Sequence, residues 1–587
     1  MQVTKPIRSP RVTLLLDAVF LIGALVILAV FTTVYLMPFR LDDVLHMDWA
    51  RENSLWDAFS VDRGEIVRSV RPIFAVTIWL LNKYAGINNY FPWHFVLVSS
   101  FLIGLTFAGK TARYIAQRDS ALYFTTGFFW LAFLPILNVL FWYGDLTFTI
   151  ELLFVTPAWY FGLRGLLEGN LKLWLVGILS GTFAVLTKEP ALLLVHLIFV
   201  GVGVLRFSEI RTTWDNFKSR RSLIAVVAYL VFFAISVKIY LASPTKSNRF
   251  FNVSALSGEQ FHFLIADRLS YYGETLLNPI GRVLLATPIV YFLSRCFGKK
   301  DRGIVVCILE IVGCAVFSFL AVKSLPVFSA ILLAAPIFGY FKRNKKQSAI
   351  LLPFALSAIL IMLVLLITVM IVKTQLTELS FVLLVISGVY WAELADEMKI
   401  NLATLFHKKA IVVTASCLLI LALAGSVFAL LPILQSKEKL LSTVRDSRSN
   451  ANDGIKWMGK NLPTNSTLLV TGHSLYGLGS ADDLTSKEDE YKSFVQYTFI
   501  QGYIRSYLHA LDRYDVGLSY ITDSVLLSRV LDSCRSAGTY YVFLQTGMDV
   551  ARFHGSINGI KQLKSTDTLV ARFAKGPYPS EVWKLAR

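Results

Sequence analysis

Long apolar stretches recur almost from one end of the sequence to the other, and this feature limits the available folds more than any other. A helix that crosses a bilayer needs about 20 mostly apolar residues. Thirteen stretches meet this requirement, near residues 12–37, 94–116, 120–142, 146–164, 171–188, 190–206, 222–242, 277–298, 303–322, 326–341, 347–372, 380–398 and 410–432. Only 16% of the residues are charged, against roughly 25% in soluble proteins. We therefore expect a polytopic α-helical membrane protein with about 13 transmembrane helices, and a cytosolic enzyme is excluded.

Basic residues lie in short clusters between the apolar stretches, and they predict the orientation. The formal net charge of +18 is spread over these connections. No single basic patch forms, which argues against a nucleic-acid partner. Cytoplasmic loops carry an excess of Lys and Arg, and every second connection is basic when the N-terminus is placed inside. Thirteen crossings then place residues 433–587 on the external side.

The C-terminal tail, residues 433–587, differs sharply in composition from the rest of the chain. It contains turn residues and charges, with strand-like runs at Ser466–Thr471, Tyr540–Gln545 and Thr568–Phe573. Helical patterns cover Asn452–Asn461 and Tyr491–Arg513. This alternation predicts a soluble, external α/β domain of ordinary size, following a transmembrane domain over residues 1–432.

The first long external loop, residues 38–93, begins with two adjacent acids, Asp42 and Asp43. Adjacent carboxylates repel each other, so one can keep a raised pKa and act as a base. The pair could instead hold a divalent cation, or it could be an acidic helix end in a solvated loop. The loop also interleaves Trp49 and Trp56 with charged residues, which is typical of short helices in the membrane interface. This context favours a catalytic loop that reaches a lipid substrate.

Three further polar residues follow the adjacent acids along the chain, each near a predicted outer end of a span. Arg71 could hold a lipid phosphate through a bidentate contact, or it could anchor a helix end by snorkelling. His94, at the mouth of the second span, is expected to be an interface residue, because no second histidine lies at metal-binding spacing. Asp145 lies at the outer turn between the third and fourth spans.

Two later segments carry further charges at predicted outer ends of spans. Lys188 and Glu189 lie at the turn between the fifth and sixth spans. A buried pair there is either functional or an ion pair that closes the turn. The second external loop, residues 243–276, contains Arg268, and Arg282 follows it at the start of the next span. Both arginines are further candidates for a phosphate contact.

Several of these elements together resemble the polytopic GT-C glycosyltransferases, and most of all the bacterial relatives of protein O-mannosyltransferases. The aminoarabinose transferases of lipid A modification are a more distant likeness. The resemblance covers residues 12–206 in order and rests on Asp42-Asp43, Arg71-Pro72, Leu81-Asn82, His94, Trp142–Asp145 and Thr187–Pro190. It implies a GT-C-like transmembrane domain in the bacterial inner (plasma) membrane, with a cytoplasmic N-terminus and a periplasmic or extracellular C-terminal domain. The tail has no 34-residue helical repeat, so the acceptor of the repeat-bearing members is not implied.

The resemblance also implies a reaction and roles for the candidate residues. A sugar would pass from a polyprenyl-phosphate donor to an envelope glycan, lipid or protein. Asp42 or Asp43 would be the base, with Asp145, Glu189 and His94 in support. The donor phosphate would be held by basic residues, for which the candidates are Arg71, Lys188, Arg268 and Arg282. The adjacent acids are compatible with Mg, with Mn or with no metal.

Two other classes share the membrane setting. A polymerase or ligase of lipid-linked glycans is the nearest alternative, and a transporter or flippase is the second. The polar residues concentrate at the outer ends of spans rather than near the midplane, which fits a transporter poorly. The sequence contains no Walker loop, CxxC or HExxH motif, so ATP-driven transport and zinc hydrolysis have no support.

Overall fold

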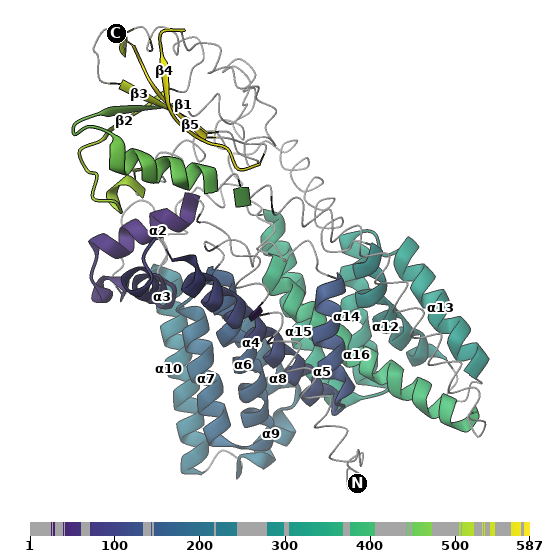
Figure 1. The fold of residues 1–587 in the computed structure, drawn as a ribbon. Helices are drawn as coiled ribbons and strands as arrows, with labels where there is room; N and C mark the ends of the chain where they lie inside the picture. The colour runs from purple at the N-terminus through teal and green to yellow at the C-terminus, as the bar shows by residue number, and fades with distance from the viewer. Residues whose placement is uncertain are drawn as a thin grey trace, which may run out of the picture.

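A computed structural model shows a helical bundle with a small β-sheet at one end (Figure 1). Apart from single-residue gaps and a few isolated residues such as Phe39 and Tyr143, it describes residues 41–59, 71–132, 146–215, 219–242, 279–298, 304–367, 376–405, 449–471, 504–521, 540–545, 565–576 and 580–586.

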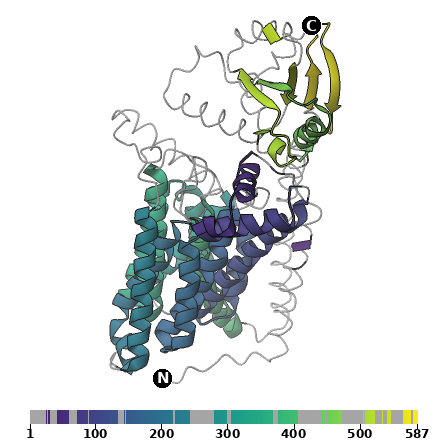
Figure 2. The ribbon, with the colours of Figure 1, turned by 90° about the vertical axis from the view of Figure 1, so that its left-hand side faces the viewer.

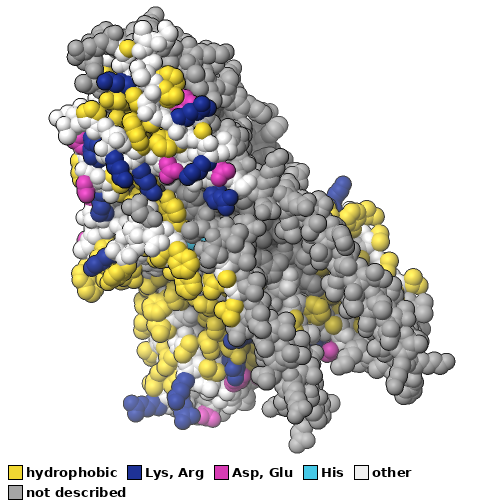
Figure 3. Space-filling model, viewed as in Figure 1, with side chains coloured by type: hydrophobic (Ala, Val, Ile, Leu, Met, Phe, Trp, Pro, Cys, Tyr) yellow, Lys and Arg dark blue, Asp and Glu magenta, His cyan; other side chains and the backbone are white. Residues whose placement is uncertain are grey.

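The bundle is built from apolar helices joined by short turns. They are α4 Tyr90–Ala116, α5 Ser120–Ala132, α6 Leu146–Glu168, α7 Leu171–Val185, α8 Ala191–Leu205, α9 Phe207–Thr213, α10 Arg220–Ala242, α12 Pro279–Phe297, α13 Ile304–Leu320, α14 Leu325–Lys342, α15 Lys345–Ile367 and α16 Leu376–Leu405. Six of the described helices are long and apolar enough to cross a membrane, or seven if α8 and α9, which meet at 86°, form one bent span. Apolar side chains cover the flank made by α7 and α10 (Figure 3). The chain is a multi-pass membrane protein.

Each predicted span from 94–116 to 380–398 overlaps one helix of the bundle, and for the span 120–142 only the part up to Ala132 lies within the described residues. The predicted turn within residues 171–206 is confirmed, because α7 ends at Val185 and α8 begins at Ala191. Helix α16 is longer than predicted at both ends, because it continues through polar residues that no apolar window includes. Most of the spans 12–37 and 410–432 lie outside the described residues, so the count of thirteen remains a prediction.

Close helix contacts in the bundle depend on small residues. A Cβ on Gly177 of α7 would lie 2.5 Å from the Cα of Gly162 in α6. Gly104 of α4 similarly faces the backbone of Leu152 in α6, and its carbonyl accepts a hydrogen bond of 2.8 Å from Thr156 Oγ1. Small residues allow helix backbones to approach closely where lipid offers no hydrophobic driving force. This packing fixes the α7–α8 turn relative to α6.

Three short helices cross one end of the bundle, which we call the outer end: α2 Leu41–Glu52, η1 Leu55–Phe59 and α3 Pro72–Tyr84 (Figures 1 and 2). The expectation of short helices in the first external loop is confirmed at these positions. Pro72 occupies the first turn of α3, where its missing N–H costs nothing. Trp79 Nε1 of α3 donates to the carbonyl of Asn53 at 3.0 Å, so α3 supports the end of α2.

The C-terminal segment contains a five-stranded mixed sheet of order β2-β1-β3-β5-β4. The strands are β1 Thr467–Thr471, β2 Gly517–Ile521, β3 Tyr540–Gln545, β4 Thr568–Phe573 and β5 Ser580–Lys584. Strands β1, β2 and β3 are parallel, and β5 runs antiparallel to β3 and β4. The three predicted strands are confirmed, and residues 449–461 are helical. Strands β2 and β5 were not predicted because their sequences lack a clear apolar alternation.

Candidate active site

The first feature of the outer end is an ion pair between Arg71 and Glu189. Arg71 is the residue before α3, and its Nη2 donates to Glu189 Oε2 at 3.0 Å. Pro72 biases the preceding residue toward extended backbone. Ile73 N also donates to the carbonyl of Leu186 at 3.2 Å, so the start of α3 is docked directly on the α7–α8 turn. Two segments more than a hundred residues apart therefore present one guanidinium and one carboxylate together.

One N–H group of Arg71 is not used in a hydrogen bond within the described residues. Its Nε atom is buried and has no acceptor among the described residues. A buried N–H without a partner costs free energy, so such groups in native proteins call for an explanation. Glu189 occupies only one edge of the guanidinium, which leaves Nε able to donate to another oxygen.

The positive charge of Arg71 lowers the pKa of two neighbouring groups, Glu189 and His46. Burial alone would raise the pKa of Glu189. The charge of Arg71 and its hydrogen bond to Glu189 lower that pKa by more, so the net result is a pKa below the ordinary value. Burial, and next the charge of Arg71, lower the pKa of His46 in α2 to about 4. The His46 ring lies edge-on to Phe74 of α3, with centroids 5.0 Å apart. His46 is therefore neutral at pH 7, and α2 lies beside the Arg71–Glu189 pair.

Lys188 lies just below this pair and is almost enclosed. Its Nζ contacts Glu378 Oε1 of α16 and is 3.9 Å from Glu151 Oε2 of α6. It also lies 3.2 Å from the centroid of the Phe148 ring, a cation–π position. Lys188 thereby connects the α7–α8 turn to α6 and α16. We call Arg71, Glu151, Lys188, Glu189 and Glu378 the outer charge cluster.

The cluster corrects one of the two interpretations of residues 188 and 189. We considered an internal pair that closes the turn, but each residue has a partner in a different element: Glu378 for Lys188 and Arg71 for Glu189. The turn separates two adjacent side chains, one toward the bundle interior and one toward α3. With three carboxylates and two cations, the cluster has a formal charge of −1 (2 − 3).

His94 and Arg282 lie in different surroundings. His94 is fully buried on α4, and its ring centroid is 5.7 Å from that of Tyr143, so it lies inside the outer end rather than at its surface. Arg282 lies in the first turn of α12, where Nη1 donates to the carbonyl of Phe319 at the end of α13 at 2.6 Å. No contact between described residues links Arg282 to the outer charge cluster.

The remaining candidates are only partly described. Asp42 and Asp43 belong to α2, one turn before His46, and their side chains lie outside the described part of the structure. Asp145 and Arg268 lie outside the described residues. Among the residues whose side chains are described, no group of three His, Cys, Asp or Glu residues could hold a metal ion. The roles proposed for these four residues, including metal binding by the acids, remain predictions.

Sequence reasoning missed three residues of this site: His46, Glu151 and Glu378. Glu151 was detectable, because it is an ionisable residue within an apolar span, and such residues are rare and usually functional. Glu378 precedes the predicted span 380–398 and gave no such signal. His46 follows the two acids by one helical turn, a spacing that places side chains on neighbouring positions of a helix.

The C-terminal sheet region covers α2 from outside. Arg51 of α2 donates to the carbonyl of His509 and lies 5.2 Å from the centroid of the Tyr514 ring. Asn452 Nδ2 donates to the carbonyl of Phe39 at 3.2 Å. Residues of α2, α3 and α4 share one apolar core with Ile455, Leu508, Phe543 and other described residues of the sheet region. The candidate site therefore lies between the transmembrane bundle and the C-terminal sheet region.

Comparison with known proteins gives a likeness to solved structures. No protein-family model and no curated protein matches the chain. Among solved structures, the crystal structure of ArnT from Cupriavidus metallidurans bound to undecaprenyl phosphate is similar, with a TM-score of 0.44 and 13% sequence identity. The likeness covers 96% of this chain and 97% of that one.

Proposed function

We propose that the protein is a membrane glycosyltransferase that moves a sugar from a polyprenyl-phosphate donor to an acceptor of the cell envelope. The reaction takes place at the outer end of the bundle, on the external side of the membrane. The observation that carries the proposal is the half-buried Arg71 guanidinium, which is held by Glu189 on one edge and has a buried, unused N–H at Nε.

Arg71 suits a phosphate ligand for geometric and electrostatic reasons. A guanidinium offers parallel N–H groups that match two phosphate oxygens. Glu189 fixes its orientation through one nitrogen and leaves the rest of the fork for substrate. The leaving group of the reaction is a polyprenyl phosphate, so a cation here also stabilises the charge that develops as the bond breaks.

The acids of α2 supply the base in this proposal. Because His46 lies within electrostatic reach of Arg71, we infer that Asp42 and Asp43, one helical turn earlier in α2, act close to the bound phosphate. A bond forms between the sugar C1 and the acceptor oxygen, while the bond from C1 to the phosphate oxygen breaks. The acceptor proton passes to Asp42 or Asp43, and polyprenyl phosphate leaves with the bonding electrons.

Lys188 has a positioning role in this arrangement. Its charge is already met by Glu378 and Glu151, so its first effect is to hold the turn that presents Glu189. Dependence on Mg²⁺ or Mn²⁺ is part of the test.

The experiment uses the full-length protein in vesicles with a radiolabelled polyprenyl-phosphate sugar. Wild-type protein should consume donor, and Arg71→Ala should raise the KM for donor by roughly 10- to 150-fold, which corresponds to the 1.5–3 kcal/mol of a charged hydrogen bond. Arg113→Ala is the matched control. Arg113 also forms an ion pair, with Asp119 at 2.9 Å, but it lies in the last turn of α4, away from the outer end.

Each assay is repeated with Mg²⁺, with Mn²⁺ and with a chelator. Product length separates transfer of one sugar from polymerisation of lipid-linked glycans. Uptake of a solute without donor consumption would indicate a transporter and would contradict the proposal. Equal KM values for Arg71→Ala and Arg113→Ala would place the phosphate contact elsewhere.

A further inference from the structure

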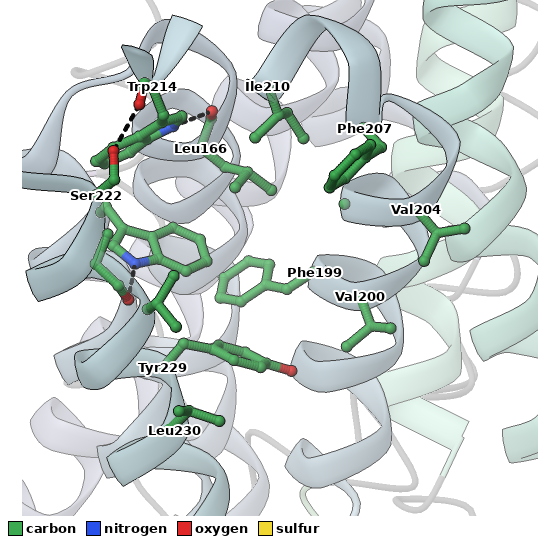
Figure 4. Close-up of a pocket in the computed structure, with 14 residues that line it drawn as sticks. Leu166, Phe199, Val200, Val204, Phe207, Ile210, Trp214, Ser222, Tyr229 and Leu230 are labelled. Atoms are coloured by element: carbon green, nitrogen blue, oxygen red, sulfur yellow. Dashed lines mark hydrogen bonds between the residues drawn. The ribbon is translucent and has the colours of Figure 1, made fainter. Parts of the chain in front are cut away.

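A groove at the opposite end of the bundle is not used by the proposed reaction. It lies between the last turns of α8, helix α9 and the first turns of α10, with a volume of about 560 Å³ (Figure 4), within the range of small-molecule sites. The 86° bend between α8 and α9 turns α9 away from the α8 axis. The positive-inside rule places this end in the cytoplasmic leaflet. We call it the inner groove.

The inner groove has no free polar group for a polar ligand. Its two tryptophans are both engaged: Trp174 Nε1 donates to the carbonyl of Ala225 at 3.0 Å, and Trp214 Nε1 donates to that of Leu166 at 2.9 Å. Ser222 Oγ donates to the carbonyl of Trp214, and the Tyr229 hydroxyl bonds to His196 Nδ1. Since these side-chain N–H and O–H groups are bonded within the protein, the part of a ligand that enters the groove must be hydrocarbon.

One side of the groove is open to the membrane. Val204 is 69% exposed and Phe207 54% exposed, and both line the groove together with Leu230 of α10. Figure 4 shows Val200, Val204 and Phe207 facing Tyr229 and Leu230 across the opening. A chain could therefore enter sideways from the lipid phase.

Several basic residues are neighbours in sequence of residues that line the end of the groove. Arg220 and Arg221 directly precede the lining residue Ser222, Arg211 follows the lining residue Ile210, and Lys172 lies two residues before Trp174. All four are exposed, and Figure 3 shows Lys and Arg side chains gathered at this end. Two acidic residues lie in the same region. Asp215 is exposed, and Glu209 forms ion pairs with Arg206 and Lys346. The rim therefore carries an excess of positive charge.

We propose that the inner groove binds one anionic diacyl phospholipid of the cytoplasmic leaflet. One acyl chain lies between α8 and α10, and the anionic headgroup lies at Arg220, Arg221 and Arg211. The charge of the rim selects this occupant, because a neutral lipid would leave the basic residues without a partner. Each basic residue near such a headgroup contributes about fivefold in affinity, from roughly 1 kcal/mol.

The test uses the full-length protein in phosphatidylcholine vesicles. One sample contains phosphatidylglycerol with a photoactivatable group in one acyl chain. A second sample contains phosphatidylcholine with the same group at the same mole fraction. Labelled peptides are then mapped by mass spectrometry. Peptides of residues 199–214 and 222–230 should be labelled more strongly by phosphatidylglycerol. The double variant Arg220→Gln and Arg221→Gln should lower that preference by about fivefold per residue.

A second variant tests the groove itself. Gly203 lines it, and a Cβ there would meet nothing within 4 Å, so Gly203→Leu adds an apolar side chain at the groove and should abolish labelling by either lipid. Gly313→Leu is the matched control, because Gly313 on α13 also faces open space away from the groove. Equal labelling by the two lipids, unchanged labelling in Gly203→Leu, or labelling by a photoactivatable polyprenyl phosphate alone would each overturn the proposal.

Discussion

The two ends of the bundle both contain charged residues within the helices, but they use them differently. At the inner end, Glu397 of α16 is surrounded: Arg295 lies 3.4 Å from Oε2, Arg343 contacts Oε1, and the Tyr291 hydroxyl donates to Oε2 at 2.9 Å. Both carboxylate oxygens are engaged. At the outer end, carboxylates outnumber cations and a buried N–H of Arg71 has no acceptor among the described residues.

This difference separates a structural cluster from a site. The Glu397 network, in which both carboxylate oxygens have partners, holds helices together, although Arg206 Nε elsewhere at the inner end is also buried without an acceptor among the described residues. A network with an unsatisfied donor loses stability unless another molecule completes it. The outer end is also the place where the sequence puts its adjacent acids, on α2. The following predictions test whether the two ends differ in this way.

The largest effect is expected from the acids of α2. Asp42→Asn and Asp43→Asn keep the side-chain shape and remove the charge. At least one should lower kcat by about 100- to 10,000-fold, the range for loss of a general base, while donor binding is retained. Donor turnover in membranes at matched expression measures this. Near-normal kcat in both variants would make α2 a structural lid and move the search for the base to Asp145 and Glu189.

Removing one cation should destabilise the protein more at the outer end, where it is Lys188, than at the inner end, where it is Arg343. Lys188→Met leaves Glu151 and Glu378 buried without their cation, which should cost about 3–5 kcal/mol. Arg343→Met removes a partly exposed partner of Glu397 but leaves Arg295 and Tyr291 in place, so the cost should be about 1 kcal/mol or less. Denaturation midpoints in detergent compare the two variants. Equal losses would show that the outer cluster is as redundant as the inner one.

His46 should make stability depend on pH. Its folded-state pKa of about 4 lies below the ordinary 6.5, so between these values the unfolded chain binds a proton that the folded chain does not. Stability should therefore fall as the pH is lowered from 7 to 4, by at most about 3 kcal/mol, and His46→Gln should remove that part of the fall. An identical pH profile for the variant would mean that His46 is not buried beside Arg71.

The smallest effect is expected at Arg282. In the structure it caps α13 through the carbonyl of Phe319, and no described contact links it to the outer charge cluster. Arg282→Gln should cost about 1 kcal/mol of stability and leave the KM for donor nearly unchanged. A KM raised as much as in Arg71→Ala would instead restore Arg282 as a phosphate ligand.

The sequence predicted most of the helices because span length and apolar composition are local properties. The turn at Lys188-Glu189-Pro190 and strands β1, β3 and β4 were also predictable from local patterns. Strands β2 and β5 were not, because their short sequences lack a clear apolar alternation.

The candidate site could be predicted only in part. Arg71, Lys188 and Glu189 were identified as charged residues at outer span ends, and the structure brings these three together. Their actual partners come from elements far apart in the chain, such as Glu378 of α16, about 190 residues beyond Lys188. No spacing rule connects such residues. The sequence alone therefore could not show that Lys188 pairs with Glu378 and Glu189 with Arg71.

The most direct test of the difference between the ends is equilibrium binding of a polyprenyl phosphate without sugar. Wild-type protein, Arg71→Gln and Arg343→Gln are compared in the same vesicles. Binding should weaken by roughly 10- to 150-fold in Arg71→Gln, as expected for a lost charged hydrogen bond, and should be unchanged in Arg343→Gln. Equal affinity in all three proteins would contradict the assignment of Arg71 as the phosphate ligand and, with it, the outer end as the donor site.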